Sequence, residues 1–169
     1  MTKHIQAEAL SSTAFSPYGD VIETQCSASD SMNDRRFDRF SDLASVDIVG
    51  PEKAMVHVVR SIDATSLPYE FVQLERHPLG SQAFVPLSEF VFVVVVAPPG
   101  DKVDATDIRA FVSNGGQGIN YHRGTWHMPL IALSAGQRFL VIERASTEPN
   151  CDSFKLDAPV ILDVLPDTA

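Results

Sequence analysis

Two short segments of the chain concentrate side chains that could carry chemistry. The first runs from Glu75 to Gln82 and reads ERHPLGSQ. Side chains alternate between the two faces of an extended strand, so Glu75 and His77 lie on one face and Arg76 on the other. Gln82 follows a Pro-Leu-Gly turn and can return to the same neighbourhood. A buried carboxylate and imidazole are costly unless a proton, a hydrogen bond or a metal ion compensates them.

The second segment runs from Gly116 to His127 and reads GQGINYHRGTWH. Within seven residues it places a phenol, two imidazoles and a guanidinium, at Tyr121, His122, Arg123 and His127. Glycines let the backbone bend closely around such groups. Histidine changes charge near neutral pH and is the commonest metal ligand. We expect Glu75, His77 and His127 to converge in one pocket, with Gln82 at its edge.

The sequence around these two segments predicts a series of short β-strands. β-branched or aromatic runs bounded by turn residues predict strands over 54–60, 69–75, 81–87, 90–97, 109–113 and 138–144. The run 90–97 is apolar on both faces, which predicts a central strand covered on both sides. Many short strands predict an all-β sandwich or barrel, with short helical turns at 11–16 and 104–107. The small polar stretch 27–34 predicts an exposed loop.

Composition limits the class of protein. The 169 residues carry 13 basic and 22 acidic side chains, which gives a formal charge of −9. This length predicts a single domain over residues 1–169, and the acidic balance argues against a nucleic-acid partner. No apolar run approaches the about 20 residues that span a bilayer, and the first residues show no apolar signal segment. We therefore expect a cytoplasmic protein with no membrane or nucleic-acid partner, and with Cys26 and Cys151 as free thiols.

The second segment resembles the second motif of the cupin superfamily, in which glycines at a fixed spacing precede a metal-binding histidine. The spacing matches through to His127, with His122 in the position usually held by proline. The resemblance implies a cupin-like β-barrel with a few short helices, and a metal-ligand set of Glu75, His77, Gln82 and His127. Imidazole and oxygen ligands together suit nickel, iron, manganese or zinc. The alternative is a hydrogen-bonded polar cluster that holds no metal.

Longer motifs are similar to the ureidoglycolate lyase family. They are FSPYGDVIET, ERHPLGSQAFVP, FVFVVVVA and RAFVSNGGQGINYHRGTWHMPL, and the resemblance runs from about Phe15 to Cys151. The resemblance implies a homodimer that releases urea and glyoxylate from (S)-ureidoglycolate in allantoin breakdown, with nickel as the metal. An older name for such proteins describes a hydrolase that releases ammonia.

Side-chain chemistry suggests roles in such a reaction. A divalent ion chelated by the substrate carboxylate and hydroxyl would make that hydroxyl easier to deprotonate. His122 or Tyr121 could transfer protons, and we favour His122 because histidine titrates near neutral pH. Arg123 or Arg144 could hold the carboxylate, and Gln82 could bond the substrate. An amidohydrolase that releases ammonia, another cupin enzyme with the same ligands, and a non-catalytic small-ligand-binding cupin are the alternatives.

Overall fold

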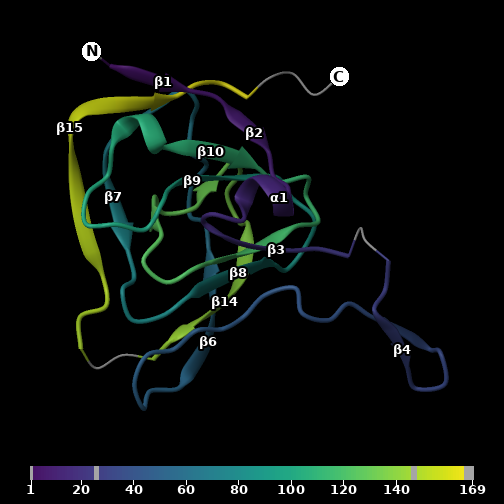
Figure 1. Ribbon diagram of the computed structural model, residues 1–169. Helices are drawn as coiled ribbons and strands as arrows, with labels where there is room; N and C mark the ends of the chain where they lie inside the picture. The colour runs from purple at the N-terminus through teal and green to yellow at the C-terminus, as the bar shows by residue number, and fades with distance from the viewer. Residues whose placement is uncertain (1, 25–26, 146–147, 166–169) are drawn as a thin grey trace.

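The computed structural model describes residues 2–24, 27–145 and 148–165, and β-strands dominate these ranges (Figure 1). The first large sheet has the order β1 (Lys3–Ile5), β15 (Asp152–Leu162), β7 (Tyr69–Arg76), β12 (Trp126–His127), β9 (Phe92–Ala97), β10 (Arg109–Val112) and β2 (Ala7–Ala9), with β13 (Ile131–Ala132) also paired to β9. The second has the order β3 (Gly19–Ile22), β11 (Gly118–Tyr121), β8 (Gln82–Pro86), β14 (Arg138–Arg144) and β6 (Ala54–Arg60). The all-β prediction is confirmed.

Side chains from both sheets form the interior of a cupin-like barrel. Inward-facing residues of β9 pack against residues of β11 and β14; they are Phe92, Val94, Val96, Ile119, Tyr121, Phe139 and Val141. Aromatic rings meet edge to face, as Phe92 and Phe139 do with centroids 5.2 Å apart and planes at 90°. This cluster joins the two sheets.

β9 is the central strand that the valine run predicts. All six of its residues are buried. Val93, Val95 and Ala97 point away from the barrel interior and pack in a second apolar cluster, with Leu74, Trp126 and residues from both ends of the chain. The prediction of a strand covered on both faces is therefore confirmed, although β9 begins two residues later than expected.

The other predicted elements differ little from the observed ones. β6 and β14 have the predicted bounds, and the remaining strands differ by one or two residues at their ends. The short helix α1 (Ser12–Phe15) begins after Ser11, whose side chain accepts a hydrogen bond from the Ala14 amide. The 3-10 turn η1 (Ala105–Asp107) is capped in the same way by Asp104. Among the described residues, no helix is long and apolar enough to cross a membrane.

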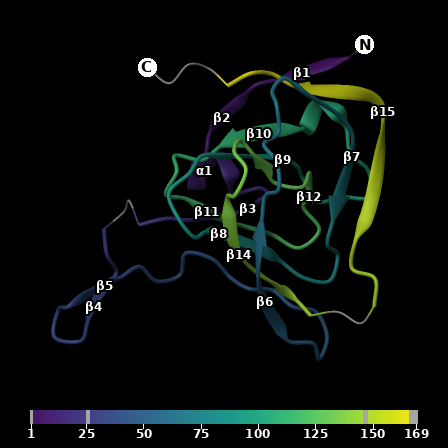
Figure 2. The ribbon, with the colours of Figure 1, turned by 180° about the vertical axis from the view of Figure 1, so that it is seen from behind.

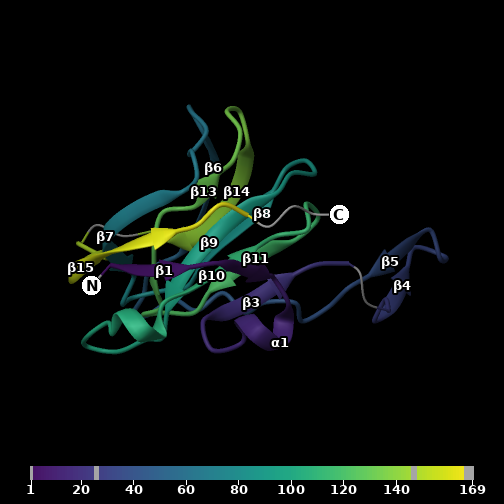
Figure 3. The same ribbon diagram turned by 90° about the horizontal axis from the view of Figure 1, so that it is seen from above.

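The prediction of a loop over 27–34 is wrong in part. Asp30–Met32 forms β4, which pairs with β5 (Phe37–Arg39) in an exposed hairpin. Asn33, Asp34 and Arg35 close the hairpin with positive φ values of 54°, 57° and 63°, a conformation that few side chains adopt readily. The hairpin projects away from the body of the protein, as the views from the front, from behind and from above all show (Figures 1, 2 and 3).

Replacing Val94 by Asp should prevent folding. The Val94 side chain is 1% exposed in the barrel interior, where a carboxylate would find neither water nor a cation. An unpaired buried charge costs several kcal/mol, a large share of the stability of a domain. Circular dichroism and thermal melting measure the outcome. The control is Val72→Asp, at a β7 position that is 41% exposed, and this protein should still fold. If Val94→Asp melted cooperatively at the wild-type temperature, this placement of β9 would be contradicted.

Candidate metal centre

The short strand β12 sets His127 beside Glu75. β12 pairs with β7 on one side and with β9 on the other, so that His127 lies directly opposite both Glu75 and Val96. Directly opposite residues point to the same face of a sheet. Val96 points into the barrel interior, and Glu75 and His127 therefore point there as well. His127 Nε2 lies 3.9 Å from Glu75 Oε1.

His77 joins this pair through strand alternation. It follows the last residue of β7 and lies two positions beyond Glu75, on the same face. The ring centroids of His77 and His127 are 5.2 Å apart. One ligand atom each from Glu75, His77 and His127 lies within 4.8 Å of the other two. The structure thus brings together three of the four predicted metal ligands, which we call the ligand triad.

Backbone carbonyls orient both imidazoles. His77 Nδ1 lies 2.6 Å from the Asn150 carbonyl oxygen, and His127 Nδ1 lies 2.9 Å from that of Thr125. A carbonyl oxygen can only accept, so each Nδ1 carries the proton and donates it. In a neutral imidazole with its proton on Nδ1, the lone pair is on Nε2. Histidines that bind metals are commonly oriented by such a bond from the other ring nitrogen.

His127 is the most deeply buried member of the triad. Its side chain is 3% exposed, and its Nε2 has no hydrogen-bond partner among the described residues. Burial lowers the pKa of His127 to about 4, although the hydrogen bond to Thr125 opposes the shift. The imidazole is therefore neutral at pH 7, and its contact with Glu75 is no ion pair. Nε2 can therefore donate its lone pair to a divalent cation held between it and the Glu75 carboxylate, and such a cation would supply the partner that this nitrogen lacks among the described residues.

Tyr121 packs directly on His127. The two rings are stacked, with centroids 4.2 Å apart and planes at 14°. The Tyr121 hydroxyl is buried and finds no hydrogen-bond partner in the part of the chain that the structure describes. Burial raises the pKa of Tyr121 well above its ordinary value, and the charge of Glu75 raises it further. The phenol therefore stays protonated and can donate a hydrogen bond to a bound molecule.

Gln82, the first residue of β8, lies opposite Tyr121 and Glu143 in the neighbouring strands. Its Nε2 donates a hydrogen bond to Glu143 Oε2 at 2.5 Å, which leaves the amide oxygen as an acceptor or ligand atom. Sequence reasoning missed Glu143, because a glutamate in a predicted strand carries no local signal of such a partner.

An open cavity of about 280 Å³ joins these residues. Its lining includes Glu75, Gln82, Tyr121 and His127, and apolar side chains such as Phe84 and Phe139 complete it. A few converging polar groups on an apolar wall are typical of a site for a small molecule. The arrangement can hold a divalent ion, accept a small polar ligand beside it, and donate one proton from a phenol.

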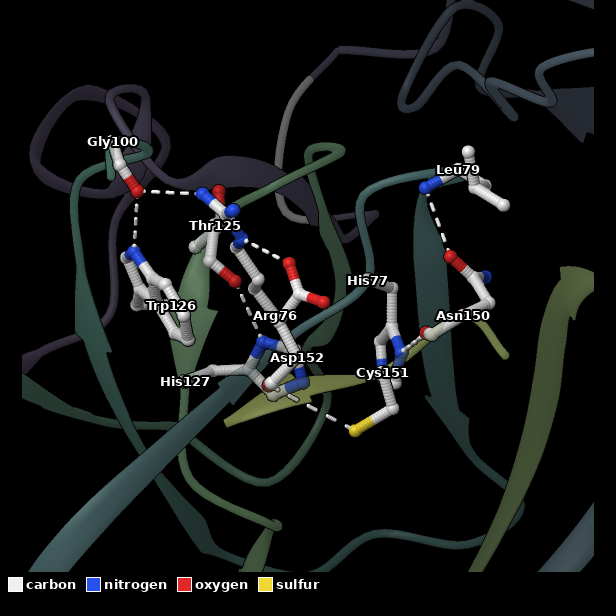
Figure 4. Close-up of polar contacts among 10 residues, drawn as sticks. All are labelled: Arg76, His77, Leu79, Gly100, Thr125, Trp126, His127, Asn150, Cys151 and Asp152. Atoms are coloured by element: carbon white, nitrogen blue, oxygen red, sulfur yellow. Dashed lines mark hydrogen bonds and ion pairs between the residues drawn. The ribbon is translucent and has the colours of Figure 1, made fainter. Parts of the chain in front are cut away.

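The opposite face of β7 and β12 holds the strand pair in place. Arg76 Nε donates a hydrogen bond to Asp152 Oδ2 at 2.9 Å, and its guanidinium lies 4.6 Å from the centroid of the Trp126 ring. Arg76 and Trp126 both donate to the carbonyl of Gly100, as Figure 4 shows. These contacts fix the two strands whose other face carries Glu75 and His127.

The structure does not bring His122 and Arg123 into this cavity. Tyr121 takes the inward position, so His122 turns to the other side, where its Nε2 lies 3.0 Å from Asp20 Oδ1. Arg123 Nε lies 3.2 Å from Asp47 Oδ2. Both side chains are thus engaged with carboxylates outside the cavity lining.

Arg144, the other candidate for a substrate carboxylate, is also engaged elsewhere. Its Nε donates to the Val49 carbonyl and its Nη2 to Glu148 Oε1, each at 2.9 Å. The Arg144 side chain is 3% exposed and does not line the cavity. It holds the segment before β6 against β14.

Cys151 lies against the triad, although no motif pointed to it. Its Sγ is 3.6 Å from Glu75 Oε2, and it is a free thiol. Partial burial raises the pKa of Cys151, and the charges of Glu75 and Asp152 raise it further. A lone cysteine beyond the last predicted strand gives no spacing from which this position could be inferred. Cys26 lies outside the described residues.

Comparison with known proteins identifies one family. A family model described as ureidoglycolate lyase matches residues 2–163. A protein of that name from Pseudomonas fluorescens is 48% identical over 157 residues, which cover 92% of this chain and 94% of that protein. Those from Stutzerimonas stutzeri and Azotobacter vinelandii are 44% and 45% identical, over 92% and 88% of this chain and 93% and 89% of theirs. The matched residues include the whole ligand triad.

In the metal-free protein, His127 should make the stability of the fold decrease in mild acid. The folded pKa is about 4, and an unfolded histidine has a pKa of about 6.5. As the pH falls below about 6.5, His127 becomes protonated in the unfolded chain but stays neutral in the folded one. By about pH 4 this difference lowers the free energy of unfolding by about 3 kcal/mol. The free energy of unfolding, measured by urea denaturation between about pH 4 and 6.5, should depend less on pH in His127→Gln than in the wild type. The exposed His4→Gln is the control, and equal dependence in wild type and His127→Gln would contradict the burial of a neutral imidazole.

Proposed function

The chain belongs to the ureidoglycolate lyase family, and we propose that it cleaves (S)-ureidoglycolate into glyoxylate and urea during the breakdown of allantoin. The enzyme is a carbon–nitrogen lyase: one bond breaks and no water enters the products. The observation that carries the proposal is the ligand triad, two of whose members, Glu75 and His127, line one small cavity together with a buried, protonated phenol.

The triad fits a divalent metal ion, for which we propose nickel. Glu75, His77 and His127 would hold it, and Gln82 lines the same cavity as Glu75 and His127. The fit rests on His127 Nε2, a buried nitrogen with its lone pair free and no hydrogen-bond partner among the described residues. When bound, such an ion acts as a Lewis acid toward the substrate hydroxyl.

The chain's own residues supply the rest of the reaction. The substrate hydroxyl loses its proton as the new carbonyl forms, and the electrons of the carbon–nitrogen bond pass to the ureido nitrogen. We assign the Tyr121 hydroxyl as the group that protonates this nitrogen and takes up the proton that the substrate hydroxyl loses, so that urea leaves whole and the phenol is restored. Phe84 and Phe139 form an apolar wall that keeps bulk water from the breaking bond.

We place proton transfer at Tyr121 rather than at His122. Tyr121 lines the cavity and stacks on a triad member, whereas His122 bonds Asp20 on the other side of β11. Arg123 bonds Asp47, and this leaves the metal and Gln82 as the proposed binders of the substrate's oxygen atoms.

We also propose that the protein is a homodimer formed through β6, the strand at the edge of the second sheet (Figure 2). Met55, Val56, Val58 and Val59 of this strand are 38–59% exposed and lie on both of its faces. An apolar edge strand that stays uncovered invites uncontrolled pairing. β6 of a second copy can cover this strand, because a two-fold axis would bring the two β6 strands together as an antiparallel pair.

Two further expectations from the sequence stay predictions. The whole chain, residues 1–169, should fold as one domain, since the family match covers residues 2–163 without a break. The protein should be cytoplasmic, which fractionation of the producing cells would test.

With nickel and (S)-ureidoglycolate, the protein should release glyoxylate and urea in equal amounts and no ammonia. Tyr121→Phe should lower kcat by about 10²–10⁴-fold, because it lacks the general acid. Its melting temperature should not fall, since the Tyr121 hydroxyl has no hydrogen-bond partner among the described residues to lose. Separate assays of the three products, with thermal melts, measure both effects.

His122→Ala is the matched control, since its imidazole bonds Asp20 outside the cavity, and it should keep its turnover. If kcat fell further in His122→Ala than in Tyr121→Phe, proton transfer would have to be assigned to His122. Stoichiometric ammonia would indicate an amidohydrolase, and substrate binding without any product would indicate a non-catalytic binding protein.

Val58→Glu should convert the dimer into a monomer, because it places two like charges across the two-fold axis in an apolar contact. Light scattering coupled to gel filtration measures the mass of each form. Val164→Glu, at an exposed position beyond β15, should remain dimeric. A monomeric wild type, or a Val58→Glu protein that stays dimeric, would remove β6 as the interface.

A further inference from the structure

We propose that Glu143 is a positioning residue, which holds the side-chain amide of Gln82 with its oxygen toward the cavity. Gln82 then accepts a hydrogen bond from a ureido N–H of the substrate, and it selects a ureido group over an end group that carries no hydrogen-bond donor. This inference rests on the lyase function proposed above. The bond to Glu143 directs Gln82 to the nitrogen end of the substrate and leaves the oxygen atoms to the metal ion.

The second sheet places Glu143 and Gln82 side by side on its inner face. β14 lies between β6 and β8, and β8 lies between β14 and β11 (Figure 2). Glu143 is directly opposite Gln82, and Gln82 is directly opposite Tyr121. Directly opposite residues share one face of a sheet, and Tyr121 lines the cavity. The carboxylate of Glu143 therefore reaches Gln82 from the side away from Tyr121.

The hydrogen bond between the two side chains orients the amide. Gln82 Nε2 donates to Glu143 Oε2 at 2.5 Å. A carboxylate only accepts, so the amide turns its nitrogen toward Glu143 and its oxygen away. That oxygen has no hydrogen-bond partner among the described residues, and it is not one of the buried polar atoms left unpaired there. It can therefore accept a hydrogen bond from a ligand in the cavity that Gln82 lines.

The carboxylate of Glu143 has a neighbour on its other side as well. His57, on β6, brings its Nε2 to 3.7 Å from Glu143 Oε1. The two carboxylate oxygens thus face different groups, the imidazole of His57 and the amide of Gln82. This arrangement restricts rotation of the carboxylate, and the amide bonded to it keeps one orientation.

The packing of the sheet does not require a polar pair at this position. Two residues along the same face, Phe84 of β8 lies opposite Val141 of β14, and both belong to the apolar interior. Replacing two hydrogen-bonded partners by apolar groups of the same shape is often neutral or stabilising. A bonded glutamate and glutamine beside a cavity therefore indicate that a ligand is recognised there.

A ureido group fits the acceptor that Gln82 presents. Both of its nitrogens carry N–H donors, whereas a ketone or an ester offers only acceptors. Gln82 lies opposite Tyr121, which we assign to the ureido nitrogen, so the two residues meet the same end of the substrate. A site that hydrogen-bonds a donor discriminates against an analogue that lacks it, because the acceptor is then left unpaired.

Two unreactive ligands test this selection in the full-length protein supplied with nickel. Hydantoate is ureidoglycolate without the hydroxyl, so it cannot be cleaved. Levulinate has the same size and charge, but a CH₂ and a CH₃ replace the two ureido nitrogens. The wild type should bind hydantoate about tenfold more tightly than levulinate, since one hydrogen bond contributes roughly this factor. In Glu143→Met the amide can turn over, and most of this preference should be lost, as isothermal titration calorimetry measures.

Further variants separate positioning from a purely structural role. Gln82→Met should lose the same preference, and adding Glu143→Met to it should cause no further loss, because Glu143 acts through Gln82. Glu70→Met, at an exposed position of β7, is the control and should keep the wild-type preference. Glu143→Gln keeps the size and polarity of the side chain, and its preference should fall too if Glu143→Met does not fold.

An unchanged preference in a folded Glu143 variant would overturn the inference. So would a further loss when Glu143→Met is added to Gln82→Met, or a wild type that binds the two ligands equally or binds neither. Release of urea from (S)-ureidoglycolate, measured in parallel, shows in each case whether the lyase function still stands.

Discussion

The site depends on the burial of His127, one of whose ring nitrogens finds no hydrogen-bond partner among the described residues. An unsatisfied buried polar group costs about 1–3 kcal/mol, and several contacts hold the imidazole in place despite that cost. Its other nitrogen donates to the Thr125 carbonyl, and the Tyr121 ring stacks on one of its faces. Its backbone lies in β12, between β7 and β9. Burial keeps the ring neutral, so the free nitrogen is a ready ligand rather than a cation.

Along β7 and β12, side chains that face the cavity alternate with side chains that hold the strands in place from the opposite face. On β7, Glu75 faces the cavity while Arg76 binds Asp152 on the far side. On β12, His127 faces the cavity while Trp126 packs into the outer apolar cluster. The outer contacts hold the strands that carry Glu75 and His127 from the face opposite the cavity. A shift of register by one residue would exchange the two sets and destroy the site.

The local patterns of the sequence predicted the all-β class and the strands β6 to β10 and β14, whereas the metal-ligand set came from the resemblance to cupins. Strong β-branched runs predicted β6 and β14 with their observed bounds, and alternation alone put Glu75 and His77 on one face. The choice between Tyr121 and His122 could not be made in this way, because it depends on the pairing of Tyr121 with Gln82 in β8. Cys151 reaches the site through the pairing of β15 with β7, a contact between distant parts of the chain that no local motif encodes.

The complete burial of β9 has a consequence for how the protein moves. Its amides are enclosed by apolar clusters on both faces and by paired strands on both edges, so they should exchange with deuterium only when the whole molecule opens. β12 is bonded to this strand, so His127 belongs to the same slow-opening part of the fold. β6 lies at an edge of the second sheet, and in a single chain its amides should exchange sooner. His127 therefore keeps its position during the smaller fluctuations that open the edges of the sheets.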